Sequence, residues 1–302
     1  MVYTYTDAEN AVAAGATGYN QGGAGQLVDN GSTIGVEHSH ELMPGVKAFG
    51  KIELQGINTT DGTSGLDALD EAYMGVEGNF GKVWVGKDDS QYEVLIGDYS
   101  NWIYEVGALN VTSSYTTAED NLVQYVSPSM GGLTLHAVVQ IDGEADPVSN
   151  AKNYPYQLGA KYEMNNFTVA LAMDSNDGDT LASGGTGSYE NSYGVSFAYT
   201  LNNLVLDAYY DTRSGEKNTG NNGADTYGLM GTYTMGANSF RLSYENQQAD
   251  IGDMETSVIT AQVIHNLSDN MYVYTEAVTR NDDNGNDDGD TNQLNVGAAY
   301  LF

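Results

Sequence analysis

The amino-acid sequence predicts an all-β chain: a membrane-spanning, antiparallel up-and-down β-barrel of about sixteen strands, formed as a single domain by residues 1–302. Three observations predict this fold. Apolar and polar residues alternate with a period of two along many short segments. Short connections alternate strictly with long ones. No segment of useful length has the periodicity of an amphipathic helix.

The alternation is clearest near the C-terminus, where Leu294 and Val296 alternate with Gln293 and Asn295. Such a strand has one apolar and one polar face, as in a wall between lipid and water. The same pattern delimits candidate strands at residues 2–14, 32–42, 46–57, 69–78, 82–87, 120–128, 133–142, 154–163, 167–175, 190–200, 204–213, 225–235, 239–247, 256–266, 271–280 and 292–302. A closed barrel of this size satisfies every backbone polar group and encloses water.

The connections fall into two classes. The short ones have turn residues typical of hairpins and lie at 43–45, 78–81, 129–132, 165–166, 202–203, 236–238 and 268–270. The long ones lie near 15–31, 58–68, 88–119, 143–153, 176–189, 214–224, 248–255 and 281–291. Outer-membrane barrels have short periplasmic turns and long outer loops, and this arrangement puts both termini at the short-turn end.

The composition excludes several classes of protein. With 41 acidic against 10 basic residues, the net charge is −31, which opposes binding to nucleic acid and favours cations. The same acidity is typical of a halophilic source. No Cys is present, so a disulfide framework or thiolate metal site is excluded. The start lacks a signal region, so we expect the signal of an exported chain to have been removed. The 23 Tyr suggest girdles at the membrane interfaces.

The connection at 88–119 is the candidate functional segment. A loop of about thirty residues without secondary structure of its own tends to be functional. We expect it to fold into the lumen as a constriction lined by Asp88, Asp89, Glu93, Asp98 and Glu105. Clustered carboxylates in a narrow lumen favour cations, and salt weakens the effect. The alternative is a solvated loop on an acidic protein.

Other charged residues fall on polar faces of candidate strands and are expected on the pore wall: Lys47, Lys51, Glu53, Asp207, Arg241 and Glu245. They could form charge ladders along the lumen, or they could only neutralise neighbouring acids. Both interpretations remain open from the sequence.

Two groups of residues could bind metal ions. The run 281–290 is rich in oxygen ligands and could hold Ca²⁺ or Mg²⁺ loosely through Asp282, Asp283, Asp287, Asp288 and Asp290. It lacks the order of an EF-hand, so a solvated outer loop is the alternative. His38 and His40 share a strand face near the expected periplasmic rim, but no third ligand is evident. No cofactor is required, and no catalytic arrangement has recognisable spacing, so an enzyme is not expected.

Several segments together resemble the general diffusion porins of Gram-negative outer membranes. The residues are NGSTIGV at 30–36, EAYMGVEGNFG at 71–81 followed by VGK at 85–87, DNLVQYVSP at 120–128 with GGL at 131–133, and the terminal Phe302. The resemblance covers nearly the whole chain. It implies a trimer of sixteen-stranded barrels in outer-membrane lipid, with the third long loop folded inward, and passive diffusion of small hydrophilic solutes and ions.

The chain departs from this family at the wall that faces the third loop. Thr33, Asp70 and Asp120 stand where members commonly carry Arg, and only Lys87 keeps a basic residue. We therefore expect a mostly anionic constriction and a preference for cations. The alternatives are a substrate-specific uptake channel, an outer-membrane enzyme or adhesin, and a soluble acidic β-sandwich.

Overall fold

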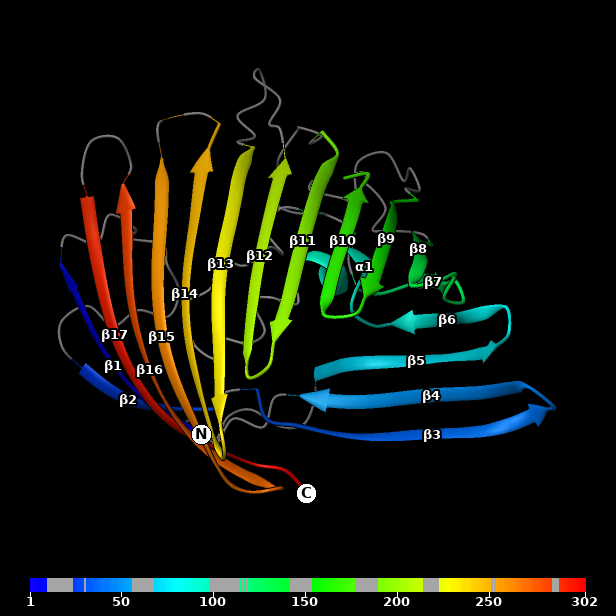
Figure 1. Ribbon diagram of the computed structural model, residues 1–302, viewed down its shortest axis with the longest axis horizontal. Coiled ribbons are helices and arrows are strands. Elements are labelled where there is room, and N and C mark those ends of the chain that lie inside the picture. The colour runs from blue at the N-terminus through cyan, green and yellow to red at the C-terminus, as the bar shows by residue number, and fades with distance from the viewer. Residues whose placement is uncertain are drawn as a thin grey trace.

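The structure, a computed structural model, describes residues 1–9, 24–29, 31–55, 68–97, 115, 117, 119–141, 154–176, 190–213, 223–250, 252, 254–283 and 288–302. In this part of the chain, seventeen antiparallel strands form one sheet and a helix lies against it (Figure 1). The strands are β1 Val2–Glu9, β2 Ala24–Val28, β3 Thr33–Met43, β4 Val46–Gln55, β5 Ala68–Gly78, β6 Gly81–Lys87, β7 Leu122–Val126, β8 Leu133–Gln140, β9 Tyr156–Met164, β10 Phe167–Asp174, β11 Ser192–Leu201, β12 Leu204–Arg213, β13 Ala224–Met235, β14 Asn238–Ala249, β15 Glu255–Ser268, β16 Met271–Asp283 and β17 Asp288–Tyr300. The helix α1 spans Gln91–Ile96, and no helix among these residues is long and apolar enough to cross a membrane.

The sheet follows the order of the chain, as the sequence predicts. From β3 to β17 each strand pairs with the next, and β1 returns to pair with β17, its first pairs being Val2 with Gly297 and Tyr3 with Val296. The amino group of Met1 also donates to the carbonyl oxygen of Ala298, at 3.0 Å. The two ends of the chain therefore lie side by side, near the turn at 268–270, where the Leu301 N–H donates to Asn270 O.

The region around the predicted first long loop differs from the expectation. Residues 24–28, placed in the loop 15–31, form strand β2, which pairs with β1 on the edge opposite β17. The strand number rises from sixteen to seventeen for this reason. No pairing joins β2 to β3 among the described residues, so the sheet has an open seam where a closed wall is expected. Among the described residues strand β3 pairs with β4 alone, and every residue of β3 is exposed.

The hairpin turns are confirmed. Asn165 and Asn202 adopt positive φ angles of 55° and 53°, and Gly45 one of 80°, as tight turns between twisted strands require. Strand limits differ from the prediction mainly in the last hairpin. There β16 and β17 extend to Asp283 and back to Asp288, because their ladder continues through residues expected in a loop. The predicted strand 120–128 is shorter, at Leu122–Val126.

The two faces of the wall have the predicted chemistry. On β17, Leu294 is 47% exposed, whereas Asn295 is fully buried. Exposed apolar side chains continue along the other strands, including Leu171, Tyr193, Leu229, Leu242 and Ile259. The opposite, inner face has buried polar side chains, including Gln124, Gln157, Glu245, Gln262 and Glu276. The inner face is therefore polar, as a wall that faces water requires.

Candidate functional site

The helix α1 is the element that positions the candidate site. Residues 88–119 were expected to have no secondary structure, but Gln91–Ile96 form a helix. The Ser90 side chain caps it by accepting the N–H of Glu93, at 3.4 Å. Ser followed three residues later by Glu is the signature of a capping box, so the sequence contained a signal for this helix.

Helix α1 lies beside β9–β11 (Figure 1). Its apolar side packs on the inner face of the wall. Tyr92, Leu95 and Ile96 form one buried cluster with Ala170 and Ala172 on β10, Tyr209 on β12 and Met230 on β13. Burying each large side chain contributes roughly 1.5–3 kcal/mol. The third loop therefore begins inside the concavity of the sheet, as predicted.

Two glycines make room for this packing. A Cβ atom at Gly194 on β11 would lie 2.7 Å from Cγ1 of Ile96 and 3.0 Å from the Tyr92 hydroxyl. A Cβ atom at Gly159 on β9 would collide with the Leu95 side chain. Both glycines are site residues that the sequence analysis did not identify.

Polar contacts from several strands fix the helix in place. Tyr92 makes two of these contacts: its hydroxyl donates to Asp211, and its N–H donates to Gln157 Oε1 at 2.8 Å. The carbonyl oxygen of Leu95 accepts the Ser196 hydroxyl at 2.6 Å. The Gln91 side chain donates through Nε2 to Gln124 Oε1 at 3.0 Å, and its Oε1 lies 2.6 Å from His136 Nδ1. These groups come from β7, β8, β9, β11 and β12. The position of α1 is therefore set by the wall on several sides.

Three of the predicted constriction carboxylates lie at the start of this segment. Asp88 accepts a hydrogen bond from Trp84 Nε1 at 2.6 Å, and Glu93 accepts one from the Tyr115 hydroxyl at 2.7 Å. Asp89 is exposed, and its carboxylate oxygen lies within 4.8 Å of oxygens on Glu93 and Glu119. The other two predicted residues, Asp98 and Glu105, lie outside the described residues.

The protonation of these carboxylates is shifted by their surroundings. Burial, followed by the nearby charges of Glu93 and Asp88, raises the pKa of Asp89 to about 7. Although its surface is open to solvent, Asp89 lies in a crowded concave region. Burial also raises the pKa of Asp88, against the hydrogen bond from Trp84, and the pKa of Glu93, against the hydrogen bond from Tyr115. Near neutral pH the charge of this cluster therefore depends on pH.

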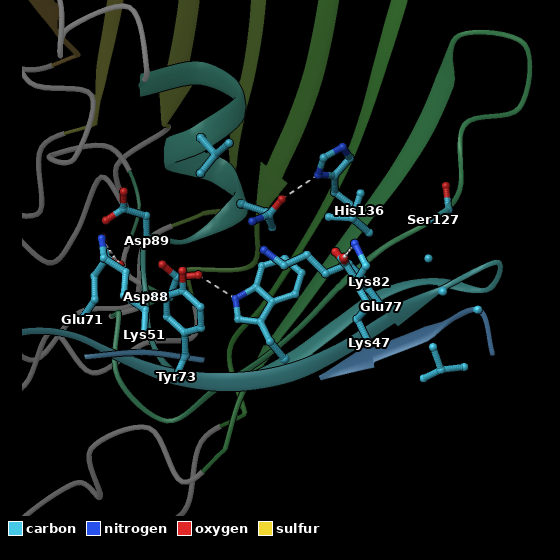
Figure 2. Close-up of a pocket in the computed structure, with 18 of the residues that line it drawn as sticks. Lys47, Lys51, Glu71, Tyr73, Glu77, Lys82, Asp88, Asp89, Ser127 and His136 are labelled. Atoms are coloured by element: carbon cyan, nitrogen blue, oxygen red, sulfur yellow. Dashed lines mark hydrogen bonds and ion pairs between the residues drawn. The ribbon is translucent and has the colours of Figure 1, made fainter. Parts of the chain in front are cut away.

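A hollow of about 850 Å³ lies between α1 and strands β4–β6 (Figure 2). In Figure 2, Asp88, Asp89, Lys51 and Glu71 gather toward one end, and Lys47, Lys82 and Glu77 toward the other. Lys51 pairs with Glu71 at 2.8 Å and with Glu53 at 2.9 Å, and Lys47 lies 3.7 Å from Glu77. The Lys82 ammonium lies over the rings of Trp84 and Phe49, at 4.4 and 4.7 Å. This side of the lumen therefore has lysines as well as carboxylates.

The residues at the departures from the porin pattern are not among those that line this hollow. Thr33 and Asp70 lie beside the Glu53 carboxylate. Lys87 pairs with Glu119 at 2.5 Å, and the carbonyl oxygen of the exposed Asp120 accepts Gln140 Nε2 at 3.0 Å.

The remaining predicted wall residues lie on the far strands. Arg241 on β14 donates to Gln262 at 2.7 Å, and Gln262 donates to Glu276 at 2.8 Å. Glu245 is buried and accepts the Tyr209 hydroxyl at 2.8 Å, whereas Asp207 is half-buried. The inner face of β12–β16 therefore contains a hydrogen-bonded polar network, within which Arg241 and Glu245 are both engaged.

The predicted Ca²⁺ or Mg²⁺ ligands are distributed differently from a loop site. Asp282 and Asp283 lie on β16 and Asp290 on β17. Asp282 pairs with Arg280 at 2.8 Å, and Asp290 accepts from Asn281 at 2.9 Å. Asp287 and the side chain of Asp288 lie outside the described part of the chain. Asp282, Asp283 and Asp290 therefore lie on strands and not in a loop, which corrects the expected loop 281–291 at these positions.

Comparison with known proteins gives the same fold. The chain is 29% identical, over 91% of its length and 84% of the relative's, to a protein of a Halomonas species named monosaccharide porin. A relative with the same identity and coverage is the major outer membrane protein of Halomonas elongata.

Among solved structures, the chain is similar to the anion-selective porin of Comamonas acidovorans, with a TM-score of 0.72 and 13% identity, covering 100% of this chain and 99% of that one. It is also similar to a loop-deletion mutant of OmpT, an outer membrane protein of Vibrio cholerae, with a TM-score of 0.71 and 18% identity, covering 99% and 96%. These likenesses support the predicted barrel architecture.

The family model for Gram-negative porins matches residues 2–286, nearly the whole chain. An enzyme and a soluble sandwich are thereby excluded, as the absence of a catalytic arrangement and the alternating loop lengths predicted. The chain belongs to the Gram-negative porin family and is a non-enzymatic channel protein of the bacterial outer membrane.

Proposed function

We propose that this porin is a diffusion channel for small hydrophilic solutes and ions that prefers cations, and that its constriction is the segment beginning at Asp88. The observation that carries this proposal is the packing of α1 on the inner wall, with Asp88, Asp89 and Glu93 beside it. A channel narrowed by a fixed segment selects by size, and the charges on that segment select by sign.

The balance of charge around the hollow supports the sign of the preference. Its lining includes the carboxylates of Glu41, Glu71, Glu77, Asp88 and Asp89 against the ammonium groups of Lys47, Lys51 and Lys82. Two of these lysines are paired with carboxylates of the wall. The net charge of the whole chain, −31, has the same sign. Cations are therefore concentrated in the lumen relative to anions.

We also propose that the functional unit is a homotrimer. Support comes from OmpT of Vibrio cholerae, solved in a trimer form, to which this chain is similar with a TM-score of 0.69 and 16% identity. Sedimentation or native mass spectrometry in detergent tests this assembly.

The test of selectivity is the reversal potential of single channels in planar bilayers under a KCl gradient. We expect the wild-type potential to indicate cation preference and the double variant Asp89→Asn with Glu93→Gln to weaken it by about twofold or more, because two charges are lost from a region of reduced dielectric. Asp269→Asn, which removes one charge at the exposed turn at 268–270, is the control and should leave the potential unchanged. Anion preference of the wild-type channel would refute the electrostatic proposal.

A second prediction concerns pH. Because the pKa of Asp89 is raised to about 7, this carboxyl is largely neutral below that pH and charged above it. We expect cation preference to increase between about pH 5.5 and about pH 8.5, and we expect Asp89→Asn to remove most of this change. Titration of the reversal potential in both proteins measures it. An identical profile in the variant would show that another group titrates.

A substrate-specific uptake channel is the second candidate. The relative named monosaccharide porin favours it, as do the rings of Tyr73 and Trp84 in the lining of the hollow. However, the Lys82 ammonium covers the face of Trp84, which leaves less of that ring for stacking on a sugar. Saturable block of ion current by a single sugar would favour the specific channel, whereas linear permeation without block favours general diffusion.

A further inference from the structure

The outward face of β3 has two imidazoles in a row of apolar side chains. Residues at alternate positions of β3 share this face, and Ile34, Val36, His38, His40 and Leu42 form the row. The chain has four histidines in all, so this pair is half of its imidazole complement. The rings of His38 and His40 stack, with centroids 5.4 Å apart and planes at 29°.

Neither ring has a polar partner in the described residues. Both side chains are exposed, and no hydrogen bond or ion pair to either is found there. By contrast, His136 contacts Gln91, and His265 contacts Asn238 at 2.9 Å. The residues opposite the pair on β4 are Gly50 for His38 and Ala48 for His40, which offer no competing group and little steric hindrance.

The surface beside the pair is also distinctive. His38 and His40 border an outward hollow of about 1030 Å³, lined mainly by apolar side chains of β3–β6 such as Ile52, Met74 and Val85. This lining contains no carboxylate, so the two imidazoles are the metal-binding side chains at this place. His40 is three residues from Met43, about 10 Å along a strand, and thus near the short-turn rim.

We propose that His38 and His40 form a site for one divalent transition-metal ion of the Cu²⁺, Ni²⁺ or Zn²⁺ class. Imidazole nitrogen suits these ions, whereas Ca²⁺ and Mg²⁺ prefer oxygen. Residues two apart on a strand are about 6.6 Å apart, and metal–nitrogen bonds are about 2.0 Å long, so a modest tilt of both exposed rings brings one nitrogen from each to a shared ion. The site is separate from the lumen and does not depend on the proposed selectivity.

The test is calorimetric titration of CuCl₂ into the full chain in detergent, with excess MgCl₂ present to occupy the acidic oxygen sites. We expect saturable binding of Cu²⁺ that weakens by about tenfold or more in His38→Asn, in His40→Asn and in the double variant. Electron paramagnetic resonance of the bound Cu²⁺ should show nitrogen ligands. Binding should also fall at low pH, because protonated imidazole cannot coordinate a metal.

The matched control is His265→Asn, which removes one exposed imidazole from the outward face of β15 and should leave Cu²⁺ binding unchanged. Correct folding of every variant is checked by heat-modifiable migration on gels. Equal Cu²⁺ affinity in the wild-type protein and the His38/His40 double variant would overturn the proposal. Purely oxygen coordination in the resonance spectrum would overturn it as well.

Discussion

Replacing Gln91–Ile96 by two glycines is expected to raise single-channel conductance by about twofold or more, because a helix with its side chains is about 10 Å across and this one lies inside the concavity of the sheet. Conductance of a water-filled pore increases with the cross-section of its narrowest part. The variant should also admit larger solutes. Both effects are measured in planar bilayers and by swelling of proteoliposomes in sugars of increasing size.

The barrel itself is expected to survive this change. The deleted segment contributes apolar burial, but strand pairing from β3 to β17 does not pass through it. The backbone hydrogen bond from Asp88 N to Glu119 O, at 3.0 Å, still closes the base of the loop. Wild-type conductance in the deletion variant would show that the pore is narrowest elsewhere.

A conservative variant distinguishes the effect of removing the helix from the effect of changing one of its side chains. Ile96→Val removes one methylene from a buried side chain and costs about 0.5–1.5 kcal/mol, which is too little to release α1 from the wall. Its conductance should equal that of the wild type. The contrast with the deletion variant then assigns the effect to the volume of the helix.

Much of the wall could be predicted because a strand has the simplest periodicity. Side chains alternate between faces, so the order Gln293, Leu294, Asn295, Val296 is enough to assign a polar and an apolar side. The exposure of Leu294 and the burial of Asn295 confirm that assignment. The positions of the turns could be predicted as well, because residues such as Asn165 tolerate the positive φ that tight hairpins need.

The two missed elements lacked such a signal. Residues 24–28 contain Ala and Gly and follow a Gly-rich run, so only their pairing with β1 defines them as a strand. The six residues of α1 are too few for helical periodicity to be visible. The pattern of Ser90 and Glu93 was the available signal, and it becomes convincing only with the tertiary packing around it.

The partners of α1 could not be predicted from one sequence. The hydrogen bond between Tyr92 and Asp211 joins residues 119 positions apart, and that between Tyr92 N and Gln157 joins residues 65 apart. Neither pair has a local motif. The role of Gly159 and Gly194 could not be predicted either. A glycine in a strand can be explained by close packing only once the position of α1 against it is known. Asp98 and Glu105 stay predictions.

The second large effect is expected from Leu242→Arg on the outward face of β14. Leu242 is 61% exposed and lies opposite Gly231 and Ala261 on the adjacent strands. An arginine facing lipid at the bilayer midplane costs about 2–4 kcal/mol, and less near the interfaces. We expect the free energy of unfolding in lipid bilayers, measured by urea titration, to fall by about that amount.

The neighbouring residue makes this prediction a test of which face meets the lipid. Arg241 is the preceding residue, yet it points to the inner face, where Gln262 accepts its hydrogen bond at 2.7 Å. The same side chain is therefore tolerated at one position and costly at the next, because the period of the strand is two. Leu242→Ala, which loses apolar contact without adding a charge, is the control and should be clearly more stable than Leu242→Arg. If the two variants unfold at the same urea concentration, Leu242 does not face the hydrocarbon of the bilayer. The assignment of the outward face of β14 as the lipid-facing side of the wall is then wrong.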